Sequence, residues 1–133
     1  MNCDRVGQIE LPDKNKISIE MFAEIYKADR EGGKWCLVDC RNETQFGIVH
    51  LKDAINIPIK KAKRDPSQIY DLAAEHETVY IMCRRGIDSK DLTDHLLQAA
   101  ETGPTASARG MIVNVEGGIS QWSKKIDNTV PYY

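Results

Sequence analysis

The stretch VYIMCRRGIDSKDL, residues 79–92, decides how the rest of the sequence is interpreted. An apolar run ends in Cys83, two arginines and a glycine follow, and the next residues look like the start of a helix. Cys83 can be a buried residue that happens to end a strand, because cysteine is among the residue types most often buried. Alternatively it is a nucleophile, because thiols between a strand and the N-terminus of a helix often have a lowered pKa.

Short apolar runs alternate with helical patterns on both sides of this stretch. This alternation predicts an α/β fold with a parallel central sheet and helices on both faces. Sites in such sheets lie beyond the carboxyl ends of the strands, and Cys83 lies at such an end. We expect strands at residues 35–39, 54–57, 78–82 and 111–115. We expect helices from residue 18 to an end at residues 31–33, and at residues 42–46, 65–76, 89–100 and 119–126.

The composition is that of one soluble globular domain. The chain has 133 residues, of which 41% are hydrophobic and 29% are charged. A net charge of -2 gives no reason to expect nucleic-acid binding, and no apolar run is long enough to span a membrane. We therefore expect a cytoplasmic protein. Residues 1–16 are polar and aperiodic, so we expect an N-terminal tail or linker there and one domain over residues 17–133.

The other three cysteines are expected to be free thiols without a catalytic role. Cys36 and Cys40 lie on one predicted strand, about 13 Å apart, whereas the Cα atoms of a disulfide lie about 4.4–6.8 Å apart. The same separation argues against a shared metal ion, and there is no Cys-x-x-Cys pair, so we expect no metal. Cys3 lies in the tail. Cys40 can approach the site, because it stands at a strand end between Asp39 and Arg41.

A run of basic residues extends over residues 60–64. Charge runs usually face water, so the simpler interpretation is a solvated loop. The alternative is a docking surface for an acidic partner.

The residues after the apolar run suit the binding of an anion. Gly86 permits a tight turn that directs successive N–H groups inward. Arg84 and Arg85 add positive charge, and Asp88 or Ser89 can cap the helix that follows. Together these features favour a thiolate at the strand end, or an anionic group attached to its sulfur.

Two other thiol chemistries lack their residues. A tyrosine-phosphatase-type loop needs an arginine six positions after the cysteine to hold the phosphoryl group, and that position is Ser89. A Cys–His protease needs an orienting histidine, and none of His50, His76 and His95 has a local signature for that role.

Three segments together resemble the rhodanese-type sulfurtransferases: CRRGIDS (residues 83–89), which is similar to the active-site loop of that family, LVDCRNETQFGIVHLKDAINIPI (37–59) and NVEGGISQW (114–122). The resemblance extends over about residues 17–133 and implies a rhodanese-like fold. It also implies that a persulfide forms on Cys83. Asp39 and Arg41 lie at a strand end, where buried ion pairs usually need partners, so we expect them to support the site rather than take part in the chemistry. The loop that binds persulfide and substrate is then made of Arg84, Arg85, Gly86, Ile87, Asp88 and Ser89.

A narrower resemblance rests on the same loop and on the terminal WSKKIDNTVPYY (122–133). Both are similar to the C-terminal rhodanese domain of the eukaryotic adenylyltransferase-sulfurtransferases, which serve molybdopterin synthesis and, through a ubiquitin-related modifier, tRNA thiolation. In that family the persulfide attacks the adenylated C-terminal glycine of a ubiquitin-like sulfur carrier, which leaves as a thiocarboxylate. The implied partners are this carrier, a persulfide donor such as a cysteine desulfurase or thiosulfate, and an N-terminal adenylating domain of the same full-length protein.

The resemblance implies no cofactor in this domain besides the sulfur on the loop cysteine. ATP and zinc belong with the adenylating domain, for which the sequence has no glycine-rich nucleotide loop, so we expect the chain to be one domain of a longer protein. Some positions depart from the family pattern. Val49 and Asp53 stand where many relatives have glycine, Gln45 where glutamate is usual, and Cys40 where valine is usual.

Two other functions remain open on the sequence alone. One is a stand-alone thiosulfate sulfurtransferase. Family members that act on thiosulfate usually end the loop with a basic residue or a threonine, whereas this loop has Asp88, whose charge we expect to disfavour small dianions. The other is a non-catalytic rhodanese-like binding module, and the intact Cys83 counts against it.

Overall fold

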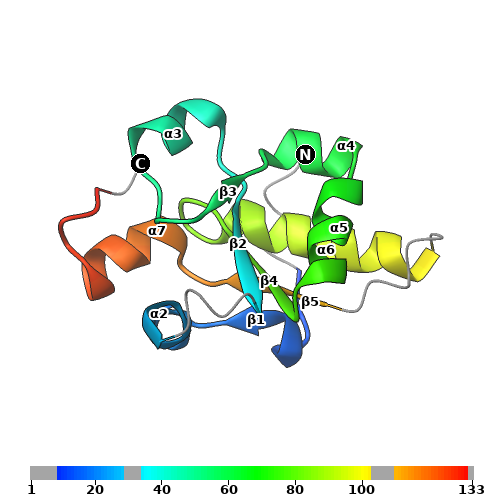
Figure 1. Cartoon of the computed structure of the whole chain (residues 1–133), viewed down its shortest axis with the longest axis horizontal. Coiled ribbons are helices and arrows are strands. Elements are labelled where there is room, and N and C mark those ends of the chain that lie inside the picture. Colours follow the sequence, from blue (N-terminus) through cyan, green and yellow to red (C-terminus); the bar gives the residue numbers. More distant parts are fainter. Residues whose placement is uncertain (1–8, 29–33, 103–109, 132–133) are drawn as a thin grey trace.

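A sheet of five parallel strands forms the centre of the molecule. The computed structural model describes residues 9–28, 34–102 and 110–131 (Figure 1). The strand order is β1-β5-β4-β2-β3. The predicted α/β fold is confirmed, and the four predicted strands are all present. The strands are β1 (Lys16–Ile17), β2 (Trp35–Asp39), β3 (Ile55–Asn56), β4 (Thr78–Met82) and β5 (Met111–Val115).

Helices cover both faces of this sheet, as predicted. One face carries α2 (Ile19–Ala28), α7 (Gly118–Gln121) and the π-helical turn η2 (Trp122–Ile126). The other face carries α4 (Ile59–Arg64), α5 (Ser67–Glu75) and α6 (Ile87–Thr102). The short helix α3 (Glu43–Ile48) buries none of its residues, and a 3-10 turn, η1 (Asp13–Asn15), precedes β1. None of the described helices is both long and apolar enough to cross a membrane.

Successive side chains along each strand point to opposite faces of the sheet, so there are two hydrophobic cores, one on each face. In β4, Val79 and Ile81 point to the side of α4, α5 and α6, whereas Tyr80 and Met82 point to the side of α2. The core on the α2 side is rich in aromatic residues, because side chains from α2, β2, β4 and η2 meet there. The same alternation places Cys83, the residue after β4, on the side of α4, α5 and α6.

Most helix boundaries agree with the sequence predictions to within about two residues. Helix α2 starts directly after Ser18, whose Oγ accepts a hydrogen bond from the N–H of Met21 at 3.2 Å. Asn42 caps α3 with its side-chain oxygen. Helix α5 starts one residue after Pro66. The predicted end of the first helix, at residues 31–33, lies outside the described residues.

The basic run is a helix, so the prediction of a solvated loop was wrong. It forms most of α4, in which Ala62 is fully buried and the N–H of Ile59 donates to the carbonyl of Cys40 at 3.0 Å. Lys63 Nζ forms an ion pair with Asp91 Oδ2 at 2.6 Å. One small residue faces the core while the charged side chains point outward. The helical period was therefore hidden by the number of charges.

Residues 9–16 pack against the sheet, whereas the sequence predicts a tail over residues 1–16. Of that segment, residues 1–8 lie outside the described residues. Leu11 is 3% exposed, and Asn15 Nδ2 donates to the carbonyl of Ile112 at 2.9 Å. These residues lead into β1, which pairs with β5 at the edge of the sheet.

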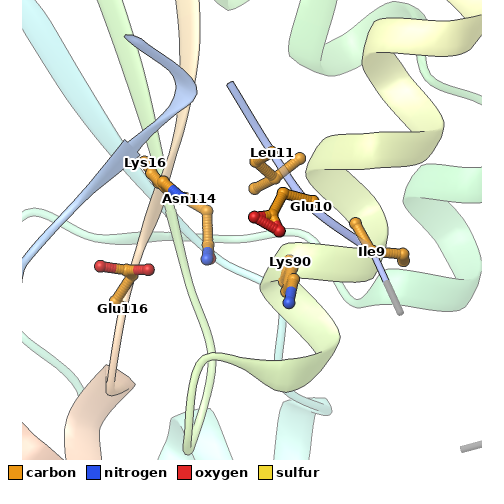
Figure 2. Close-up of a pocket in the computed structure, with 7 residues that line it drawn as sticks. All are labelled: Ile9, Glu10, Leu11, Lys16, Lys90, Asn114 and Glu116. Carbon is orange, nitrogen blue, oxygen red and sulfur yellow. The ribbon is translucent and has the colours of Figure 1, made fainter. Parts of the chain in front are cut away.

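A polar hollow of about 210 Å³ lies between this N-terminal segment, β5 and the start of α6 (Figure 2). Asn114 enters it from β5, and Oδ1 of that side chain is buried without a hydrogen-bond partner. Charged side chains from the N-terminal segment, from α6 and from the residue after β5 surround it: Glu10, Lys16, Lys90 and Glu116. None of the described residues that line this hollow is a cysteine, so the thiol chemistry lies elsewhere.

If residues 9–16 pack against the sheet, their buried side chains should contribute to the free energy of unfolding. Replacing Leu11 by alanine should lower the free energy of unfolding by about 2–4 kcal/mol, because a buried leucine leaves a cavity when it is truncated. Urea denaturation measures this. Met21→Ala is the matched control, because Met21 is 61% exposed. If Leu11→Ala costs no more than the control, residues 9–16 are a tail in solution.

Candidate active site

Cys83 directly follows β4, at the carboxyl end of the central strand of the sheet. Its sulfur accepts hydrogen bonds from the N–H of Gly86 at 3.0 Å and from the N–H of Ser89 at 3.3 Å. The Oγ of Ser89 lies 3.3 Å from the same sulfur. The side chain is 3% exposed. The loop thus curls around the sulfur with N–H groups pointing inward, which is the geometry that an anion requires.

Two glycine contacts hold this loop in shape. Gly86 has a φ of +86°, and a Cβ atom there would lie 2.7 Å from the backbone nitrogen of Gly117. Gly118 has a φ of +58°, and a Cβ atom there would lie 2.3 Å from the carbonyl oxygen of Cys83. That carbonyl accepts a hydrogen bond from the N–H of Ile119 at 3.0 Å. The turn between β5 and α7 therefore supports the site.

Helix α6 starts at Ile87, so the prediction that Asp88 or Ser89 caps it was wrong. Both residues lie in its first turn, where backbone N–H groups have no partner inside the helix. The N–H of Ser89 instead donates to the sulfur of Cys83. The carbonyl of Ser89 accepts a hydrogen bond from Thr93 Oγ1 at 2.7 Å. The sulfur therefore takes the place of a capping side chain.

Hydrogen bonds lower the pKa of Cys83 to about 6, from the usual 9.0 of a thiol. The largest cause is a hydrogen bond from the side chain of Cys40. Burial opposes it, and the side chain and backbone of Ser89 and the backbone of Arg85 lower the pKa further. Cys83 is therefore mostly a thiolate at neutral pH. The side chains of Arg84 and Arg85 are exposed, so hydrogen bonds, rather than the arginine charges that the sequence suggested, hold the thiolate.

The other described cysteines keep their protons at neutral pH. Burial raises the pKa of Cys36 to about 11. The pKa of Cys40 is raised well above its usual value by the hydrogen bond to Cys83 and by burial. All three described cysteines are free thiols, and Cys3 lies outside the described residues. Among the described thiols, Cys83 is thus the one prepared to act as a nucleophile.

Asp39 and Arg41 form a buried ion pair beside the loop. Arg41 Nη2 lies 2.7 Å from Asp39 Oδ2, and Arg41 Nε lies 3.0 Å from Asp39 Oδ1. Arg41 Nη2 also donates to the carbonyl of Val49 at 2.6 Å. Asn56 Nδ2 donates to the carbonyls of both residues at 3.0 Å. The pair thus fixes the chain that leaves β2, and its supporting role in the site stays a prediction.

A hollow of about 210 Å³ opens above Cys83. Its wall contains positive and negative side chains together with one exposed apolar residue, Ile87, which is 52% exposed. Gly86 and Ser89 hold the sulfur of Cys83, and Asp39 holds Arg41, which lines the hollow. Gln45, on the first turn of α3, is the lining residue that the sequence did not assign to the site. The lining residues are Arg41, Gln45, Cys83, Arg84, Arg85, Ile87 and Asp88.

The described histidines give no support to a Cys–His pair. The ring of His50 stacks on Phe46 at 3.7 Å and its Nδ1 lies 2.7 Å from the carbonyl of that residue. His76 Nδ1 lies 2.9 Å from the carbonyl of Leu72. None of the described histidines, including His95, lines the hollow above Cys83.

Comparison with known proteins places this geometry in a family. The sequence profile described as the Rhodanese-like domain matches residues 22–125. A relative from Ogataea parapolymorpha, named adenylyltransferase and sulfurtransferase uba4, is 37% identical over 98 residues, which are 73% of this chain and 22% of the relative. A relative from Aedes aegypti, adenylyltransferase and sulfurtransferase MOCS3, is 35% identical over 99 residues, with the same coverage of 73% and 22%. The chain thus spans about a fifth of the length of these curated relatives.

Solved structures agree with the fold. A rhodanese-related protein from Thermoplasma volcanium superimposes with a TM-score of 0.63 at 23% sequence identity. The alignment covers 84% of this chain and 93% of the other. At this level of identity the similarity shows the fold alone.

Removing one hydrogen-bond donor from the site should change the reactivity of Cys83. Ser89→Ala removes the Oγ hydrogen bond and should raise the pKa of Cys83 by about one unit from its value near 6. The pH dependence of labelling by iodoacetamide measures this, and the midpoint should move upward. Ser67→Ala, at an exposed serine of α5, should leave it in place. Equal midpoints for Ser89→Ala and the wild type would contradict this description of the site.

Proposed function

The chain belongs to the rhodanese-like domain family, and on that premise we propose that it is a sulfurtransferase domain. Cys83 takes up a sulfur atom as a persulfide and passes it to the adenylated C-terminal glycine of a ubiquitin-like sulfur carrier. The observation that carries this proposal is the convergence of hydrogen bonds from Gly86 and Ser89 on one thiolate, below an open hollow.

The loading step uses the lowered pKa. The thiolate of Cys83 attacks the outer sulfur of the donor, and the electron pair of the broken bond leaves with the rest of the donor. With thiosulfate the leaving group is sulfite, and with a desulfurase it is the thiolate of the donor cysteine. A thiol with a pKa near the ambient pH suits this exchange, because it is ionised and remains nucleophilic.

The hollow has the character needed to hold the persulfide. Its wall carries Arg41, Arg84 and Arg85, which suit an anionic outer sulfur and the acyl phosphate of an adenylated glycine. Its open side admits the extended end of a protein chain. The transfer step forms a bond between the outer sulfur and the glycine carbonyl, and AMP leaves. A thiol then attacks the sulfur of Cys83, the sulfur–sulfur bond breaks, and the carrier leaves as a thiocarboxylate while Cys83 and the attacking thiol form a disulfide.

The similarity to the named adenylyltransferase and sulfurtransferase proteins supports this choice of acceptor. Those relatives are about five times as long as the matched region, so an adenylating domain in the same protein is the expected partner. Molybdopterin synthesis, tRNA thiolation and a cytoplasmic location belong to this proposal. ATP and zinc would be needed by the adenylating domain only.

The experiment that tests this function supplies the acceptor in its activated form. The chain is first loaded with sulfur. It is then mixed with a ubiquitin-like carrier, ATP and the adenylating domain that activates the carrier. Mass spectrometry should find the carrier as a thiocarboxylate with the wild type and not with Cys83→Ser. Equal thiocarboxylate formation with both proteins would contradict the proposal. Loading of Cys83 with transfer to cyanide alone would favour the stand-alone thiosulfate sulfurtransferase.

A binding-only module is the second candidate, and the site gives it little support. A module that only recognises a partner has no need of a thiolate held by hydrogen bonds. Cys83 has a lowered pKa, and its sulfur accepts hydrogen bonds from two backbone N–H groups. Poor labelling of Cys83 by an alkylating agent at neutral pH would favour this candidate.

Asp88 makes a prediction about the sulfur donor. Its exposed carboxylate lines the hollow and lowers the positive charge that a small dianion would meet. Asp88→Arg should therefore raise turnover of thiosulfate by at least about threefold. Steady-state assay with cyanide as acceptor measures it. Asp94→Arg makes the same change of charge on the same helix outside the hollow and should have no such effect. Unchanged turnover in Asp88→Arg would remove Asp88 as a determinant of donor choice.

A further inference from the structure

Cys40 and Cys83 are neighbours because of the register of the sheet. Strands β2 and β4 are parallel, and Asp39 pairs with Met82, so the next residue of each chain segment continues the same row. The N–H of Cys40 donates to the carbonyl of Met82 at 2.9 Å, which keeps this row in register. Neighbouring strands lie about 4.8 Å apart. Both cysteine side chains belong to the core on the side of α4, α5 and α6.

The surroundings of Cys40 make its thiol a hydrogen-bond donor and a poor nucleophile. It is 1% exposed and lies among apolar side chains such as Val38 and Ile57. The interaction with Cys83 and burial raise its pKa well above that of an ordinary thiol. At neutral pH it therefore carries its proton, and the register of β2 and β4 places it beside Cys83 on the same face of the sheet.

We propose that Cys40 is a positioning residue for sulfur transfer: its thiol donates to the sulfur of Cys83 and stabilises the thiolate that forms when the persulfide gives up its outer sulfur. The proposal extends the proposed function and rests on it. With cyanide as the acceptor, cyanide attacks the outer sulfur, the bond between the two sulfurs breaks, and its electron pair goes to the inner sulfur, so Cys83 becomes a thiolate again. With the carrier glycine as the acceptor, Cys83 becomes a thiolate again when a further thiol reduces the disulfide that remains on it.

Cys40 should affect the two halves of the reaction in opposite directions. A stabilised thiolate is a better leaving group, so transfer from the persulfide is faster. The same stabilisation makes the ionised Cys83 a weaker nucleophile, so loading is slowed once every Cys83 is ionised. The residue thus favours release of sulfur over uptake. Valine, which is usual at this position in the family pattern, has no donor and cannot have this effect.

Other charged groups around Cys83 stay unchanged when Cys40 is replaced. On the side of β2 these are Asp39 and Arg41, which pair with each other. On the loop and the first turn of α6 they are Arg84, Arg85 and Asp88. The turn between β5 and α7 meets Cys83 through backbone groups at Gly118 and Ile119. A change of pKa in a Cys40 variant therefore reports on the missing donor.

The test measures the pKa of Cys83 and its two half-reactions in Cys40→Ala and Cys40→Ser. The pH dependence of iodoacetamide labelling gives the pKa without any sulfur transfer. Alanine removes the donor, so the midpoint should rise by about one to two pH units. Serine keeps an O–H donor, so its midpoint should stay near that of the wild type. Cys36→Ala is the matched control, because Cys36 is buried on the same face of the same strand, and it should change nothing.

Single-turnover mass spectrometry then follows the sulfur. The loaded protein is mixed with cyanide, and discharge should be about three to ten times slower in Cys40→Ala than in the wild type or Cys40→Ser. Loading from thiosulfate, at a pH above both midpoints, should not be slower in Cys40→Ala. A merely structural role would slow both half-reactions equally and leave the midpoint in place.

The outcomes separate the two proposals. An unchanged midpoint in Cys40→Ala, with urea denaturation showing a folded protein, overturns the role of Cys40, and so does equal slowing of loading and discharge. If Cys40→Ala does not fold, a Cys40→Ser midpoint that has moved to the usual value of a thiol overturns it. A wild-type chain that cannot be loaded counts against the proposed function, and the midpoints still decide the role of Cys40.

Discussion

The hydrogen bonds that meet at the sulfur of Cys83 are the constraint on which the rest of the site depends. For the N–H groups of Gly86 and Ser89 to reach one atom, the chain must turn sharply after β4 and start a helix within four residues. Only a residue without a side chain fits at Gly86, because the turn after β5 lies against it. The start of α6, the loop and the turn before α7 are thus shaped around one sulfur atom.

The sheet supplies the second part of the arrangement. Parallel strands end at the same edge, so the carboxyl ends of β2 and β4 bring Cys40 beside Cys83 and place the buried pair of Asp39 and Arg41 next to the loop. Burial alone would raise the pKa of a thiol at this depth. The hydrogen bonds reverse that effect for Cys83, while Cys40 keeps its proton. Two neighbouring cysteines at the ends of adjacent strands therefore differ in protonation because of their hydrogen bonds.

The sequence predicted the strands and the position of Cys83 well, because buried parallel strands are continuous apolar runs that charge and glycine interrupt clearly. It failed where long-range contacts decide the structure. Leu11 looks like part of a polar tail in the sequence, although it is buried in the folded chain. Ala62 is one small buried residue among charges, so the sequence shows no apolar stripe from which α4 could be predicted. The closeness of Gly118 to the carbonyl of Cys83 depends on residues 35 positions apart, for which no local pattern exists. In the candidate site, the loop residues were visible in the sequence, whereas the donor from Cys40 required the register of two strands.

The most direct test of the account is the intact mass of the chain after exposure to a sulfur donor. The wild type and Cys83→Ala are each incubated with thiosulfate, or with a cysteine desulfurase and cysteine, and then with a reducing agent. We predict that the wild type gains one sulfur atom, that the reducing agent removes it, and that Cys83→Ala gains none. No gain in the wild type with either donor, or an equal gain in both proteins, would contradict the claim that Cys83 carries the sulfur.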